Sequence, residues 1–172
     1  MRCLYRVRPY EKVPGSANAL HEKWKKRVID FVGNTKILSH RKYRKMCRQI
    51  IRDFDNLDRV DVKKPRVGVV GEILVKFHPA ANNDLVGLLE SEGAEAVVPD
   101  IIGFMNYSLY NQIWKSDNLG MGKKAKYFAR AFINIIQMVE KPMNKALKAS
   151  SRFDGIHSID ALAADTEKII SI

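Results

Sequence analysis

The chain has 172 residues and a formal net charge of +11, from 30 Lys and Arg against 19 Asp and Glu. This length suits one domain, or one domain with a helical extension. No apolar run approaches the roughly 18 residues that a membrane span needs, and the amino terminus lacks the apolar region of a signal peptide. Two cysteines without a C-x-x-C pattern are typical of a reducing compartment, so we expect a cytoplasmic protein that meets no membrane.

The charge excess is confined to the amino-terminal third of the chain. Residues 1–66 carry 19 Lys and Arg against 7 Asp and Glu, a balance of +12, whereas residues 67–172 carry 11 against 12, a balance of −1. The shift coincides with Lys63-Lys64-Pro65. We therefore expect a basic helical extension over residues 1–64 and a separate module over residues 65–172.

The basic extension is expected to contain two amphipathic helices. Residues 2–15 partly alternate between apolar and basic side chains, which predicts a short strand. Ser16 is placed to begin a helix that runs to about Val32, and Ser39 is placed to cap a second one. Apolar residues recur at helical spacing in both segments, so the two helices should pack together as a hairpin.

The second of these helices carries its cations on one face, namely Arg41, Lys42, Arg44, Lys45, Arg48 and Arg52. Clustered Lys and Arg are typical of phosphate binding, so a nucleic-acid interface is one interpretation. The others are a plain solvated surface, a docking face for an acidic partner domain, and a face that meets the phosphates of a CoA ester. The sequence leaves these alternatives open.

The stretch from Pro65 to Pro99 is the centre of the second module. Residues 67–75 form an apolar run that predicts a strand buried on both faces. Asn82 or Asn83 is placed to cap a helix, and residues 95–98 predict a second strand. Because such crossovers join parallel strands, we expect a β-α-β unit.

Glu72 is the acid within this apolar run. One interpretation places it just past a strand end, in solvent or bonded to a neighbouring loop. The other places Glu72, Asn82 and Asn83 at the carboxyl ends of the strands, where open α/β sheets bind ligands. These three are the candidate ligand-binding residues. The sequence shows no serine elbow, no metal-ligating histidine spacing and no Walker-type glycine loop, so no catalytic or metal-binding residue is assigned.

Three further helices are expected after Pro99, near residues 105–114, over 123–149 and after Ser158. In the longest, the residues expected inside are Phe128, Phe132, Ile135, Ile136 and Val139. The apolar end, residues 169–172, predicts a strand cut at its beginning. The expected fold is therefore α/β: a short parallel sheet with helices on both faces, like half of a Rossmann or flavodoxin fold, truncated at its carboxyl end and preceded by the basic helical hairpin.

Several motifs, taken in order, resemble a known family. They are Gly71-Glu72-Ile73, Pro79, Asn82-Asn83 and Leu89-Glu90-Ser91-Glu92-Gly93-Ala94-Glu95. This order is similar to that of the 2-hydroxyacyl-CoA dehydratase-like family, and more narrowly to the carboxyl-terminal region of large acyl-CoA dehydratase activase-related proteins. Arg8-Pro9-Tyr10-Glu11 resembles the sequence that leads into this region, so the resemblance extends over nearly the whole chain.

The resemblance implies a role in the ATP-dependent reductive activation or dehydration of 2-hydroxyacyl-CoA in anaerobic metabolism. In that family a [4Fe–4S] cluster and ATP are held by other segments, whereas Cys3 and Cys47 here lie far apart. We therefore expect a fragment that holds no cofactor and is not catalytic alone. Its expected partners are other domains or subunits of a dehydratase/activase system, with a CoA thioester as a candidate ligand. The alternative is a nucleic-acid-binding module that uses the basic helices.

Overall fold

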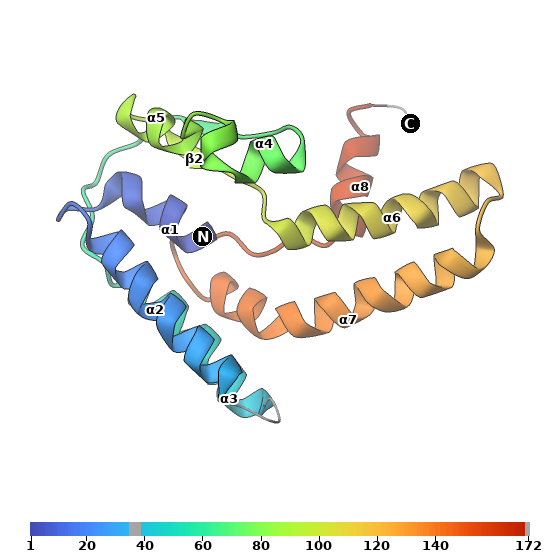
Figure 1. The fold of residues 1–172 in the computed structure, drawn as a ribbon, viewed down its shortest axis with the longest axis horizontal. Coiled ribbons are helices and arrows are strands. Elements are labelled where there is room, and N and C mark those ends of the chain that lie inside the picture. The colour runs from blue at the N-terminus through green and yellow to red at the C-terminus, as the bar shows by residue number, and fades with distance from the viewer. Residues whose placement is uncertain (35–38, 171–172) are drawn as a thin grey trace.

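The computed structural model describes residues 1–34 and 39–170, which are mostly helical with one small parallel sheet (Figure 1). The expected mixture of helices and parallel strands is present, with helix dominant. In chain order the elements are α1 (Arg2–Val7), the 3-10 turn η1 (Arg8–Tyr10), α2 (Ser16–Gly33), α3 (His40–Asp55), β1 (Arg66–Gly68), α4 (Ile73–Phe77), the 3-10 turn η2 (Pro79–Ala81), α5 (Leu85–Ser91), β2 (Glu95–Val97), α6 (Ile101–Leu119), α7 (Lys123–Lys148) and α8 (Ile159–Glu167).

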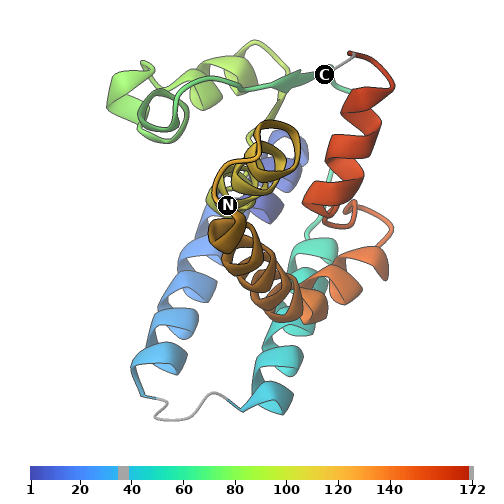
Figure 2. The ribbon, with the colours of Figure 1, turned by 90° about the vertical axis from the view of Figure 1, so that its right-hand side faces the viewer.

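The expected basic hairpin is formed by α2 and α3, which run antiparallel (Figure 2). α3 begins where the sequence predicts, because the Ser39 side chain accepts a hydrogen bond from the backbone N–H of Lys42 at 3.5 Å. The hairpin is tied near its base by the indole N–H of Trp24, which donates to Asp53 Oδ2 at 3.0 Å. The apolar face of α3 is buried at Cys47, Ile51 and Phe54.

The predicted strand within residues 2–15 is wrong, because this segment forms α1 and η1 instead. Leu4 and Val7 are both 3% exposed and lie three residues apart, which is a helical spacing. Both side chains belong to the core that also contains Trp24 and Phe54. Residues 2–15 alternate only weakly between apolar and basic side chains. Packing on the helical hairpin therefore outweighs this pattern and makes the segment helical.

The two strands pair in parallel, as the β-α-β prediction requires. Arg66 lies opposite Glu95, Val67 opposite Ala96 and Gly68 opposite Val97. The first strand ends at Gly68, however, so the predicted strand over 67–75 is wrong from residue 69 onward. Its remainder leaves the sheet at Gly71, whose φ is +129°, a value that L side chains rarely adopt, and turns into helix α4. All three residues of β1 are exposed, so the prediction of a strand buried on both faces is also wrong, because within the described chain β2 and no further layer pairs with it.

The predicted terminal strand is also absent from the part of it that the structure describes. Ile169 and Ile170 lie in a turn after α8, where both backbone N–H groups donate to the carbonyl of Thr166. Residues 171–172 of the predicted strand lie outside the described residues. Within the described chain, the sheet consists of β1 and β2 alone, and none of the helices there is long and apolar enough to cross a membrane.

The main core joins the amino-terminal helices to the end of α7. It consists of Leu4, Val7, Ala17, Trp24, Ile51, Phe54, Ala146, Leu147 and Phe153. A second, smaller cluster lies between the antiparallel helices α6 and α7, and α8 packs on α6. The boundary between residues 64 and 65 stays a prediction, and the main core draws side chains from both sides of it.

α7 buries a different face from the one that its large apolar residues predict. Phe128 is 67% exposed, and Ile135 and Val139 are each 54% exposed. In this half of α7 the buried residues are instead Ala129 and Ile133, which pack against α6. A small residue such as Ala129 lets α6 and α7 approach closely. The interface therefore forms on the face of α7 that carries Ala129, and the large side chains of the other face stay exposed.

Candidate ligand-binding site

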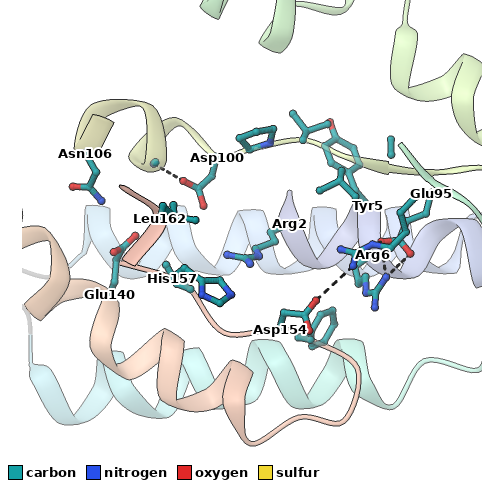
Figure 3. Close-up of a pocket in the computed structure, with 18 of the residues that line it drawn as sticks. Arg2, Tyr5, Arg6, Glu95, Asp100, Asn106, Glu140, Asp154, His157 and Leu162 are labelled. Carbon is teal, nitrogen blue, oxygen red and sulfur yellow. Dashed lines mark hydrogen bonds and ion pairs between the residues drawn. The ribbon is translucent and has the colours of Figure 1, made fainter. Parts of the chain in front are cut away.

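A pocket of about 380 Å³ lies where six segments meet (Figure 3). Its walls come from α1, from Arg66 of β1, from β2 and the connection to α6, from the first turns of α6, from Glu140 of α7, and from residues 153–162. These segments are remote in sequence but adjacent to the core. The pocket combines apolar walls with charged groups at two ends, which is the usual make-up of a small-molecule site.

One end of the pocket is closed by a buried carboxylate. Glu95 on β2 is 1% exposed and binds both Arg6 and Arg66. Arg6 Nη1 donates to Glu95 Oε1 at 2.6 Å, Arg66 Nε donates to the same oxygen at 3.1 Å, and the Tyr10 hydroxyl donates to Oε2 at 2.8 Å. The parallel register places Arg66 directly opposite Glu95. Three side-chain donors thus satisfy the two acceptor oxygens of Glu95 in its buried position.

A second ion pair lies beside this cluster. Arg8 binds Glu90 with both ends of its guanidinium, through Nε at 2.7 Å and Nη2 at 3.0 Å. Burial, followed by the hydrogen bond to Glu95, raises the pKa of Tyr10. The segment Arg8–Tyr10 therefore contacts two of the three acids in the run from Leu89 to Glu95, so two of the motifs that carry the family resemblance touch each other in the folded chain.

The other end of the pocket holds polar groups with few partners (Figure 3). Asp100 caps α6, since its Oδ1 accepts from the backbone N–H of Gly103 at 2.6 Å. Asn106 is 9% exposed, and its buried Oδ1 has no hydrogen-bond partner. Glu140 is half-buried, and burial followed by the negative charge of Asp100 raises the pKa of its carboxyl group.

The predicted site residues Glu72, Asn82 and Asn83 lie elsewhere, around α4. Glu72 caps this helix, and its Oε2 accepts from the N–H of Leu74 at 2.8 Å and of Val75 at 3.3 Å. Asn82 bridges two elements, since its Nδ2 donates to the carbonyl of Val75 at 2.7 Å and its Oδ1 accepts from Leu85 at 3.1 Å.

The predicted helix after Asn82 begins at Leu85, and Asp84 stands at its N-cap position, so the prediction that Asn82 or Asn83 caps it is wrong. Asn83 and Asp84 adopt left-handed conformations, with φ of 53° and 51°, which keep them out of the helix. Glu72 and Asn82 thus both hold Val75 of α4, and Asn83 is exposed. Their observed bonds support local structure. A ligand role for these three residues stays a prediction.

The predicted basic surface is exposed in full on α3. All six of its cations are exposed, and none forms an ion pair with a described residue; they are Arg41, Lys42, Arg44, Lys45, Arg48 and Arg52. The face is therefore free to meet an anionic partner.

The two cysteines do not fit an iron–sulfur cluster. Burial raises the pKa of the Cys3 thiol to about 11, and burial also raises the pKa of Cys47. Thiolates, not thiols, bind iron, and a [4Fe–4S] cluster takes four of them. Across the described residues, no group of three His, Cys, Asp or Glu side chains is arranged to hold a metal ion.

No family model, curated protein or solved structure matches this chain. The resemblance therefore depends on the motifs quoted above alone. Sequence reasoning did not select Glu95, Asn106 or Glu140 as site residues. Glu95 had a signal, because it is an acid inside an apolar strand, whereas Asn106 and Glu140 lie on helices that only the folded chain brings together.

Proposed function

We propose that this chain is a non-catalytic module of an acyl-CoA dehydratase/activase system, which acts on 2-hydroxyacyl-CoA thioesters in the cytoplasm. One observation carries the proposal. The segment Arg8–Tyr10 and the run from Leu89 to Glu95, which resemble separate stretches of that family, are joined by the Arg8–Glu90 pair and the Tyr10–Glu95 hydrogen bond. Motifs far apart in sequence thus form one structural unit.

The use of the acids in these motifs supports a non-catalytic role. Glu90 and Glu95 are both occupied by arginines, and Glu72 is occupied by the backbone of α4. A general acid or base must reach a substrate with a free lone pair or proton. Glu72, Glu90 and Glu95 therefore serve to hold the fold, and we expect ATP and the [4Fe–4S] cluster to be bound by other parts of the system.

Exposed apolar side chains favour the proposal that this chain binds other domains or subunits of the same system. The outer face of α7 carries large exposed side chains, namely Tyr127, Phe128, Ile135, Met138 and Val139. Contiguous apolar surface of this kind marks protein contacts. We also propose that β1 and β2 belong to a wider parallel sheet with helices on both faces, since each strand has an unpaired edge in the described chain and edges attract further strands.

Deletion of the reading frame tests the proposal. Anaerobic extracts of the deletion strain and its parent are assayed for ATP-dependent dehydration of a panel of 2-hydroxyacyl-CoA thioesters. We expect the deletion extract to lose activity on at least one thioester, and the gene supplied in trans to restore it. A gene carrying Glu167→Gln, an exposed change on α8, is the matched control and should restore it equally. Equal activity of both extracts on every thioester would contradict the proposal.

The exposed, unpaired cations of α3 favour nucleic-acid binding as a second candidate. Fluorescence anisotropy with labelled duplex and single-stranded oligonucleotides should then show log affinity falling linearly with log salt. Reversal of Arg41, Lys45 and Arg48 to glutamate should flatten that slope. Reversal of Lys123 and Lys124, exposed at the start of α7, is the control and should leave it steep. Undetectable binding at low salt would remove this candidate.

A further inference from the structure

Three polar side chains around one end of the pocket, Arg2, Asn106 and Glu140, each lack a hydrogen-bond partner or an ion-pair partner within the described chain. Asn106 is more than nine-tenths buried, and its amide forms no hydrogen bond within the described chain. Glu140 is half-buried without a cation within 4.0 Å. Arg2 lies across the pocket and donates only to the carbonyl of Gly155, at 3.3 Å.

An unpaired amide of this kind is costly in a folded protein. A buried polar group without a partner costs about 1–3 kcal/mol, and nearly all such groups are paired. Asn106 and Glu140 both line this end of the pocket, so one molecule in the pocket can contact both side chains. A half-turn of the amide exchanges its oxygen and nitrogen, which lets it accept a hydrogen bond from a ligand.

We propose that this end of the pocket binds a free α-amino acid with an apolar side chain. The ammonium group lies against Glu140 and the Asn106 amide, and the carboxylate lies against the Arg2 guanidinium, which suits planar two-oxygen acceptors. The apolar side chain lies on the wall formed by Val98, Pro99, Ile156 and Leu162.

The charges that line the pocket favour a zwitterionic amino acid as the ligand. Arg6 and Arg66 are committed to Glu95, and Asp100 is committed to its helix. Asp154 also lines the pocket and pairs with Arg66 at 3.9 Å. Arg2 and Glu140 form no ion pair with a described residue, so a zwitterion supplies each of them with an opposite charge. The Asp100 carboxylate repels that of Glu140, and an ammonium offsets this repulsion.

Calorimetric titration of the full chain tests the proposal. L-Leucine, L-phenylalanine and L-methionine are the probes, and we expect saturable one-to-one binding of at least one. Three leucine analogues each change one group: 4-methylpentanoate lacks the ammonium, 3-methylbutylamine lacks the carboxylate, and 2-hydroxy-4-methylpentanoate replaces the ammonium by a hydroxyl. Each should bind at least about tenfold more weakly. No binding of any amino acid at about 10 mM overturns the proposal, as does equal binding of the analogues.

Variants separate ligand binding from folding. Glu140→Gln and Arg2→Gln should each weaken amino-acid binding by about tenfold or more. Their matched controls, Glu167→Gln and Arg59→Gln, change exposed side chains outside the pocket and should bind as the parent does. Asn106→Leu should abolish binding and raise the melting temperature together, because it removes an unpaired buried amide. Undiminished binding by Asn106→Leu overturns the proposal.

Discussion

Replacement of Glu95 by glutamine tests the contact between the two motifs. The carboxylate is 1% exposed and is bound by Arg6, Arg66 and Tyr10. A hydrogen bond to a charged group contributes about 1.5–3 kcal/mol. Arg66 contributes less than about 1 kcal/mol, because its side chain is 50% exposed and water screens the pair. Glutamine keeps one acceptor oxygen but turns an NH₂ group toward the arginines. We therefore expect Glu95→Gln to lower the free energy of unfolding by about 2–3 kcal/mol.

Urea denaturation, followed by circular dichroism, measures this loss. With a slope of about 2 kcal/mol/M, the midpoint should fall by about 1–1.5 M. Glu167→Gln is the control, and its exposed position predicts a change within about 0.5 kcal/mol. A double-mutant cycle with Arg6→Gln should show a coupling of at least about 1 kcal/mol. A loss for Glu95→Gln as small as the control's, or no coupling to Arg6, would refute the reasoning.

Three further results are expected. Asn82→Ala removes the bridge from Val75 to Leu85 and should cost about 1 kcal/mol in urea denaturation, whereas no change would contradict this bridge. Burial raises the pKa of Glu140 above its ordinary value of 4.5, so its contribution to stability is greatest below pH 4.5 and is lost as pH rises through the folded pKa. Glu140→Gln should therefore melt higher than the parent at pH 7 and equally below pH 4.5; a lower melting temperature at pH 7 would contradict this. Cys3, with a pKa of about 11, should react slowly with iodoacetamide at neutral pH unless the chain is unfolded, and fast native alkylation would contradict its burial.

The helical hairpin could be predicted from the sequence because its signals are local. Ser39 is a strong cap, and the apolar residues of α3 recur at one spacing over four turns. The same holds for the parallel β-α-β order, where the turn residues and the short apolar run before Pro99 fix the connection. In both cases, neighbouring residues decide the outcome.

The length of the first strand could not be predicted from its apolar pattern. Residues 73–77 are as apolar as a buried strand, but a carboxylate at Glu72 accepts two backbone N–H groups and begins a helix there. Short apolar runs suit helix and strand equally, so a capping residue decides between them. The left-handed turn at Gly71 completes the change of direction.

The pocket could not be predicted because its groups are brought together by packing. Arg2, Asn106 and Glu140 come from three helices that the sequence separates by many residues. The packed face of α7 decides where Glu140 lies, and that face follows the small residue Ala129, not the large ones such as Phe128. Periodicity identifies an amphipathic helix, but it does not say which of two apolar faces is covered first.

In its proposed role, this chain is part of a dehydratase system but does not itself bind the [4Fe–4S] cluster. Anaerobic incubation of the purified chain with iron and sulfide, followed by absorbance in the thiolate-to-iron band, tests this directly. With Cys3 and Cys47 as its two thiols, both with raised pKa values, the chain should take up no stoichiometric cluster. Uptake of one [4Fe–4S] cluster per chain, stable to desalting, would contradict the account.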